Sequence, residues 1–229
     1  MTLLIMLTIV LALSGLAMHG LTRRYLSPAG QTQHLRESKG RPISEAQFQR
    51  YARINSVLSL ALVYGPAWAL QGIVLRSGPV SPWRVIVEGV AVLLVYDFGY
   101  YLVHRYPFHE WRLLRAVHAV HHTIKNPNAR DSLYQHPLEN FLGLALFWLT
   151  WVVVAAVAGP LSIYSFGWTF LVYSLINVMN HAGLRFQTFP LTALNYFGTR
   201  HYKHHTSMKS KSYGSIVPFY DWIFRTEEA

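Results

Sequence analysis

The chain alternates long apolar stretches with shorter polar segments. Five stretches are each close to the roughly 20 apolar residues that a helix needs to cross a bilayer. They run approximately from Leu3 to Leu21, Ile54 to Leu75, Val85 to His104, Asn140 to Ala158 and Ser162 to Asn180. The pattern predicts an all-α, polytopic membrane helical bundle with about four or five spans.

Local signals refine the ends of these stretches. The first resembles a signal peptide in length, but it lacks a basic leader and ends at Met18-His19-Gly20 without a clear small-x-small cleavage site. We therefore expect a retained transmembrane or anchor helix. Gly159-Pro160 predicts a tight turn between the fourth and fifth helices. Ser44-x-x-Gln47 resembles a capping box that opens the second.

The composition agrees with a membrane protein. The chain is 52% hydrophobic and 13% charged, which is about half the charged fraction of a soluble domain. Lys and Arg outnumber Asp and Glu by 20 to 10. A nucleic-acid partner would explain this surplus, but the apolar content argues against one.

The basic residues are distributed unevenly along the chain. All but Arg76 and Arg84 lie in segments 22–53, 105–139 and 182–229. Because cytoplasmic loops of membrane proteins are enriched in Lys and Arg, these three segments are predicted to be cytoplasmic. The chain has no cysteine, which excludes thiolate ligands, iron–sulfur clusters and cysteine nucleophiles.

A five-residue pattern with three histidines occurs twice in the predicted cytoplasmic segments. Its copies are His118-Ala-Val-His121-His122 and His201-Tyr-Lys-His204-His205. Residues at i, i+3 and i+4 share a helix face, so the three imidazoles of each copy can converge. The two adjacent histidines differ by about 100° around a helix, which suits contact with two neighbouring metal ions.

Two further pairs extend the set of donors. His104 and His109 are five residues apart, a poor fit to one α-helical face. Pro107 lies between them, so we expect the third span to end near His104 and His109 to begin a new element. Asn177 and His181 are four residues apart at the end of the fifth span and share a face.

Together these donors predict a polynuclear metal site. The candidate ligands are His104, His109, His118, His121, His122, Asn177, His181, His201, His204 and His205. Imidazole admits zinc, copper, iron or nickel. A structural zinc site needs only four ligands, so this larger set favours two metal ions with open positions for chemistry.

Two residues near the ligands are candidates for orienting them. Asp97 lies seven residues before His104, nearly on the same face and two turns deeper. An acid inside a membrane span is a candidate functional residue, here as the acceptor of an imidazole N–H. His136 fits either such a role or a purely structural one.

At these residues the sequence resembles the fatty acid hydroxylase / sterol desaturase superfamily of membrane di-iron oxygenases. The resemblance runs from about Asp97 to Thr226 and includes the order of the histidine patterns. His136-Pro137-Leu138-Glu139 resembles the family's His-Pro-x-Glu segment, which adds Glu139 to the candidates for orienting ligands. Arg225 departs from the family's usual closing Phe-Gly-Thr.

The resemblance implies a cytoplasmic helical cap around two iron ions, on a multi-pass integral membrane protein. Residues 1–84 would supply membrane helices and a linker, and residues 85–229 the histidine-box domain. The irons would use O2 and two electrons to hydroxylate or desaturate a C–H bond of a sterol, fatty acyl or related lipid. No side chain beyond the metal centre is needed as a catalyst.

The electrons require a partner protein. The sequence has no flavin-type Gly-x-Gly-x-x-Gly and no cysteines for a ferredoxin centre. We expect a separate reductase, cytochrome or ferredoxin, docked on the basic surface. The alternatives are a membrane metal transporter or metal-binding protein and a catalytically silent relative. Transport would favour ligands near the bilayer midplane, whereas most of the imidazoles lie in the connecting segments.

Overall fold

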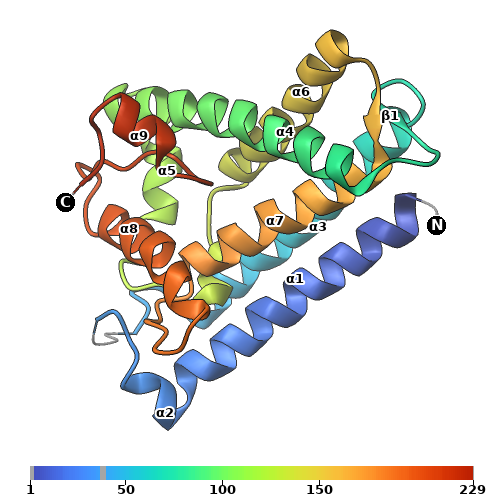
Figure 1. The fold of residues 1–229 in the computed structure, drawn as a ribbon. Helices are drawn as coiled ribbons and strands as arrows, with labels where there is room; N and C mark the ends of the chain where they lie inside the picture. Colours follow the sequence, from blue (N-terminus) through green and yellow to red (C-terminus); the bar gives the residue numbers. More distant parts are fainter. Residues whose placement is uncertain (1–2, 37–39, 229) are drawn as a thin grey trace.

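The computed structural model describes residues 3–36 and 40–228, and each of the five apolar stretches forms a helix (Figure 1). The long helices are α1 (Leu3–Leu26), α3 (Glu45–Ala69), α4 (Pro82–Val103), α6 (Pro137–Ala158) and α7 (Ile163–Asn180). Capping explains where several of them begin. Ser44, Ser81 and Ser162 each accept a hydrogen bond from a backbone N–H in the first turn of the following helix.

The long helices pack around a core rich in aromatic side chains. Helix α1 packs on α7, α3 packs on α6, and α4 packs on both α6 and α7. Tyr96, Phe147, Trp151 and Phe166 are almost fully buried at these contacts. Close van der Waals packing of these large aromatic surfaces helps to hold the helices together.

The connection between α6 and α7 agrees with the sequence analysis. Helix α6 ends at Gly159, whose φ of 80° is a conformation that favours glycine. Strand β2 (Leu161–Ser162) follows and pairs in parallel with β1 (Leu75–Arg76). This two-stranded sheet ties the α3–α4 connection to the α6–α7 connection.

Among the described residues, three helices are long and apolar enough to cross a membrane. They are α1, the continuous helix Pro82–Glu110 and α6. Large apolar side chains on the outside of the bundle, such as Leu16, Val57 and Val157, are exposed. An extended apolar exterior of this kind is typical of a lipid-facing surface. The sequence predicted four or five spans and a metal site on the cytoplasmic side, and both stay predictions.

As expected, the α-helix ends next to His104, at Val103, and His109 belongs to a separate element, but the helical path does not break there. The chain continues from α4 directly into a π-helix, η1 (His104–Glu110), to make one helical segment of 29 residues. Pro107 has no N–H and its ring clashes with an α-helical backbone. The wider π turn, with i→i+5 hydrogen bonds, accommodates it without ending the helix.

The shorter elements lie mostly toward one end of the bundle, together with the C-terminal segment (Figure 1). They are α2 (Pro28–Gln31), α5 (Arg115–His121), η2 (Ala129–Leu133), η3 (Leu191–Leu194), α8 (Asn195–His205) and α9 (Phe219–Ile223). Helices α5 and α8 carry the two repeated histidine patterns. The architecture is therefore a helical bundle with a helical cap, as the sequence predicts.

Candidate metal centre

Nine histidines from η1, α5, α7 and α8 converge inside the cap, and they form two groups. In each group, every residue offers one donor atom, and these atoms lie within 4.8 Å of one another. The larger group is His104, His109, His118, His122 and His204, and the smaller is His121, His181, His201 and His205. All are buried except His201, which is partly exposed.

The neighbours His121 and His122 belong to different groups, the division that helical geometry predicts. The second pattern divides in the same way, since His204 joins the larger group and His205 the smaller. Each repeated pattern therefore contributes to both groups. The cap places two candidate metal sites next to each other.

The π-helix explains the spacing of His104 and His109. Residues five apart are brought together by a turn with i→i+5 hydrogen bonds, whereas an α-helix would separate them around its axis. The two ring centroids lie 5.0 Å apart. Both rings therefore reach the same group from one continuous element.

Most of these rings are oriented through Nδ1. The Nδ1–H donors of His104, His204 and His205 face the backbone carbonyls of other segments, and that of His118 faces a carboxylate oxygen of Glu139. Their partners are Tyr213 O at 2.7 Å, Lys211 O at 2.8 Å, Ile124 O at 3.1 Å and Glu139 Oε1 at 2.9 Å. His109 and His181 face Met208 O and Asn177 O in the same way. An acceptor at Nδ1 fixes the tautomer and leaves Nε2 free to bind a metal.

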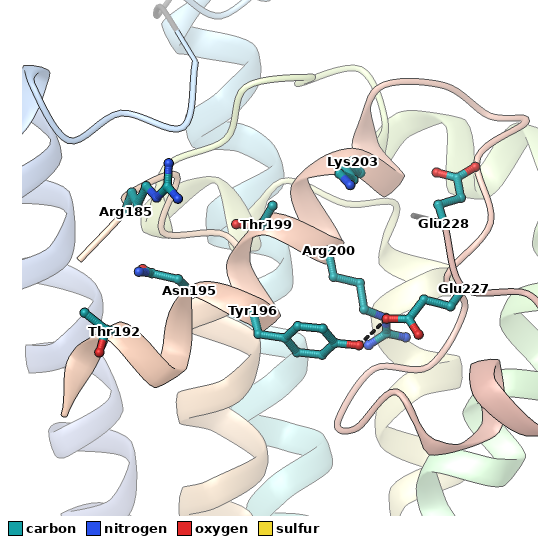
Figure 2. Close-up of a pocket in the computed structure, with 9 residues that line it drawn as sticks. All are labelled: Arg185, Thr192, Asn195, Tyr196, Thr199, Arg200, Lys203, Glu227 and Glu228. Carbon is teal, nitrogen blue, oxygen red and sulfur yellow. Dashed lines mark hydrogen bonds between the residues drawn. The ribbon is translucent and has the colours of Figure 1, made fainter. Parts of the chain in front are cut away.

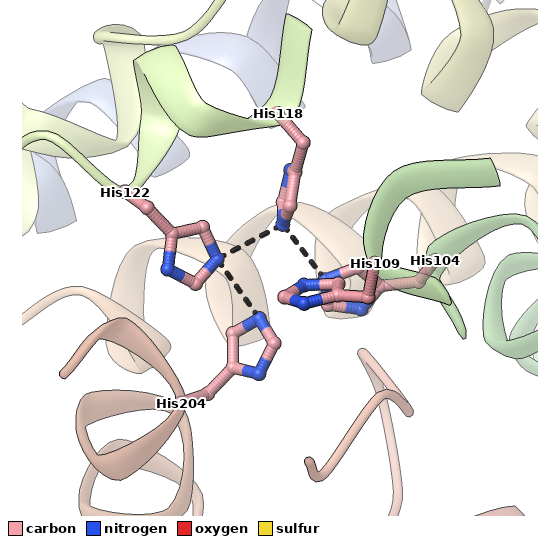
Figure 3. A group of neighbouring side chains, drawn as sticks. All are labelled: His104, His109, His118, His122 and His204. Atoms are coloured by element: carbon pink, nitrogen blue, oxygen red, sulfur yellow. Dashed lines mark hydrogen bonds between the residues drawn. The ribbon is translucent and has the colours of Figure 1, made fainter. Parts of the chain in front are cut away.

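The Nε2 atoms of the larger group face one another (Figure 3). His118 Nε2 lies 3.0 Å from that of His104 and 2.9 Å from that of His122. Because His104 and His204 both direct Nδ1–H to a backbone carbonyl, which can only accept, their Nε2 atoms are both lone pairs within the same group of donors. Converging lone pairs are stabilised by a cation between them, so the donor set fits a metal ion.

Protonation does not supply that cation. Burial, followed by the neighbouring imidazole of His109, lowers the pKa of His204 to about 3. Burial also lowers the pKa of His118 and His205 well below the usual value. The rings are therefore neutral near pH 7, which is the form that binds metals.

The candidates for orienting ligands have different positions. Glu139 contacts His118, as described above. His136 is the N-cap of α6, where its Nδ1 accepts a hydrogen bond from Leu138 N at 3.1 Å. This contact gives the ring a capping role, and a role of His136 in orienting a ligand stays a prediction.

Asp97 differs from the expectation that it accepts an imidazole N–H. Its buried carboxylate accepts backbone hydrogen bonds from Ser215 and Ile216 at 2.8 Å and from Val217 at 3.2 Å. It therefore holds the segment whose carbonyl at Tyr213 orients His104. The sequence spacing showed its proximity to the site, but the partner lies 118 residues or more away in the chain.

Asn177 lies beside the smaller group. The residue borders a small cavity of about 30 Å³, together with His104, His121, His181 and His201. Its backbone carbonyl accepts from His181 Nδ1 at 2.8 Å. The structure thus brings Asn177 to the metal centre, and a ligand role for its amide stays a prediction.

Sequence reasoning missed a buried ion pair that supports the centre. Arg200 on α8 donates to Asp221 on α9. The Asp221 carboxylate also accepts from the backbone N–H groups of Tyr213 and Gly214, each at 2.8 Å. The pair therefore fastens the carbonyl-bearing C-terminal segment to the helix that supplies three histidines.

A second, larger cavity of about 640 Å³ lies on another face of α8 (Figure 2). It is lined by polar side chains that include Asn195, Tyr196, Thr199 and Lys203, at helical spacings distinct from those of the histidines. No histidine lines it in the part of the chain that the structure describes. It is not part of the candidate metal centre.

A known protein family matches the part of the chain that contains this site. Residues 89–226 match the family model described as fatty acid hydroxylase, and this range contains every candidate ligand. The chain belongs to the fatty acid hydroxylase family. Within the matched range lie the π-helix, both repeated histidine patterns and the C-terminal segment that orients them.

Several known proteins are similar to the chain. Fatty acid hydroxylase vlmA from Lecanicillium sp is 31% identical over 58% of this chain and 40% of its own length. Very-long-chain aldehyde decarbonylase GL1-5 from Oryza sativa subsp. indica is 29% identical over 63% of this chain and 24% of its own length. Methylsterol monooxygenase 1 from Danio rerio is 29% identical over 58% of this chain and 44% of its own length.

The matches thus cover less than half the length of each of these three relatives. No solved structure gives a significant match to the chain.

Proposed function

We propose that the protein is a membrane-bound oxidoreductase that uses O2 and two electrons to hydroxylate or desaturate a C–H bond of a lipid. The observation that carries this proposal is the pair of adjacent, buried groups of converging imidazoles. Family membership supports it, since relatives are named as hydroxylases and monooxygenases. The named substrates of those relatives are lipids, which agrees with an apolar helical bundle beside the site.

We infer that iron occupies both groups. The candidate ligands would hold it as neutral Nε2 donors, and Asn177 would add an amide oxygen. Iron bound there would supply the activation of O2, which no side chain of the protein can perform. The protein's own residues position the donors, keep the centre buried and exclude water.

The overall reaction sets what must reach the site. Hydroxylation places one oxygen atom of O2 in the C–H bond and releases the other as water, with two electrons and two protons from a donor. Desaturation removes two hydrogen atoms from the lipid and releases both oxygen atoms as water. A separate reductase, cytochrome or ferredoxin would supply the electrons.

The geometry favours this function over metal transport. A transporter needs polar ligands along a path through the membrane. Here the imidazoles are collected in one cap and held rigidly by acceptors on their Nδ1 atoms. Such fixed, convergent donors favour a permanent centre rather than a series of weak sites.

The proposal is tested by expressing the wild-type protein and His122→Ala in cells supplied with labelled O2. Lipid analysis should find a product only with the wild type. An oxygen label in that product shows hydroxylation, and an added double bond without label shows desaturation. Purified protein without iron, or an unchanged product with His122→Ala, would contradict the proposal.

A further inference from the structure

The bundle contains a pocket of about 320 Å³ between α1, α3, α6 and α7, apart from the histidines themselves. We name it the interhelical pocket. Its size falls within the range of about 300–1,000 Å³ typical of small-molecule sites. Its walls come from the apolar helices, so the pocket is suited to a molecule that dissolves in the bilayer.

The interhelical pocket has a polar end and an apolar end. On α3, Asn55, Ser56 and Ser59 line the part near the cap, and Val63 lines the part farther along the helix. Helices α6 and α7 repeat this order. Asn140 and Asn177 lie toward the cap, whereas Leu144 and Phe170 lie one or two turns deeper in the bundle. On α3 and α6 polarity therefore falls with distance from the cap, while α1 and α7 also place Ser14, Tyr173 and Ser174 deeper in the pocket.

The polar end adjoins the metal centre. Ser132, Gln135 and Asn177 line both the interhelical pocket and the small cavity. The same small cavity is bordered by His121 and His201 of the smaller histidine group. A molecule in the pocket thus has its polar end next to the proposed site of oxidation.

One polar group at this end lacks a partner. The Asn55 amide nitrogen donates to the carbonyls of Leu133 and Gln135, at 2.9 and 2.8 Å, which fixes the orientation of the side chain. Its carbonyl Oδ1 is buried with no hydrogen-bond partner in the described part of the chain. A buried acceptor without a donor is costly. Because Asn55 lines the pocket, a ligand O–H or N–H that reaches Oδ1 by a small shift of the side chain would complement it.

We propose that the interhelical pocket binds the lipid substrate with its polar group toward the metal centre and its tail toward the bilayer interior. The oxidised C–H bond then lies within the first few carbons of a hydroxyl- or N–H-bearing polar group, and not in the distal part of the chain. This proposal rests on the proposed oxygenase function and specifies its substrate class and position of attack.

Gly15 offers a way to fill the pocket. It lines the pocket on α1, and a Cβ at this position would meet no atom within 4 Å. Gly20 on the same helix has equally open surroundings but does not line the pocket. Gly15→Phe should therefore occupy the ligand's space, and Gly20→Phe is the matched control.

Binding is measured with a hexadecanol probe that carries a diazirine in its tail, by cross-linking to the protein in membranes. We expect labelled peptides from α1 and α3. Gly15→Phe should lower both labelling and lipid product by about tenfold or more. Gly20→Phe should match the wild type, and the metal content of both variants should be unchanged. Wild-type labelling and turnover in Gly15→Phe would overturn the proposal.

A competition experiment tests the hydrogen-bond donor. Unlabelled hexadecanol should displace the probe more strongly than hexadecyl methyl ether, which has the same tail but no O–H. Equal displacement by the two compounds would refute the assignment of Asn55 Oδ1 as a ligand acceptor. This measurement needs neither metal nor turnover.

The position of attack is read from products formed with labelled O2, by fragmentation in a mass spectrometer. We expect the oxygen or the new double bond within the first few carbons of the polar group. A modification in the distal half of the chain would overturn the proposed orientation. Absence of any oxidised lipid would instead contradict the proposed function, while cross-linking would still decide whether the pocket binds a lipid.

Discussion

Individual imidazoles in the cap are held mainly by backbone carbonyls. Tyr213, Lys211 and Ile124 each present a carbonyl oxygen to a histidine Nδ1, and a mutation cannot remove these acceptors. Glu139 is a side-chain acceptor with the same task, at His118. Glu139 is therefore the position at which a mutation can measure how much a fixed histidine tautomer contributes to metal retention.

Glu139→Ala should weaken metal retention by about 10–100-fold, the usual cost of losing a group that orients a ligand. Glu139→Gln keeps an oxygen acceptor and should lose less. Metal content after a timed chelator challenge provides the measurement. Glu45→Ala, which changes an exposed acid on α3, is the control. Equal retention in Glu139→Ala and the wild type would show that the contact does not support the metal.

For His136 we expect a loss of stability rather than a loss of metal, because its ring caps α6. His136→Ala should lower the free energy of unfolding by about 1 kcal/mol, the typical cost of a lost N-cap. Metal content should stay at the wild-type level. His136→Ser restores a capping oxygen and should recover the stability in thermal unfolding. Loss of metal in both variants would identify His136 as a ligand.

Among the elements, η1 explains a spacing that an α-helix cannot. The interval of five between His104 and His109 suggested a break in the helix, whereas the structure keeps one continuous segment with a π turn. Phe108, one residue earlier, stacks on His118 with ring centroids 4.9 Å apart. The register of η1 thus places an imidazole and an aromatic ring in distinct positions around the larger group.

Exchanging the two side chains tests this register. In Phe108→His/His109→Phe, the imidazole is moved to the i+4 position that an α-helix would use. If η1 is a π-helix, the exchanged protein should bind no more metal than His109→Ala. The measurement is the metal content of the purified exchanged variant, His109→Ala and the wild type. Metal binding close to the wild type in the exchanged variant would show that the turn is α-helical.

Some features of the whole molecule could be predicted from the sequence, and others could not. Apolar stretches of helical length located all five long helices, and the adjacent His121 and His122 indicated two metal groups. Other features depended on contacts far apart in the chain. The backbone partners of Asp97 lie 118 residues or more away, in the C-terminal segment. The carbonyl acceptors are invisible in a sequence because every residue has one.

The candidate metal centre brings together histidines from η1, α5, α7 and α8, which are separate elements of the chain. A ligand that binds only the folded state raises stability by about 4 kcal/mol when present at 1,000 times its dissociation constant. Chelation of the metal should therefore lower the thermal unfolding temperature of the detergent-solubilised protein, and Fe(II) should restore it. The double variant His122→Ala/His205→Ala removes one donor from each group and should respond to neither treatment. An unfolding temperature of the wild type that is insensitive to chelator, with metal loss confirmed, would show that the cap holds its four elements together without the metal.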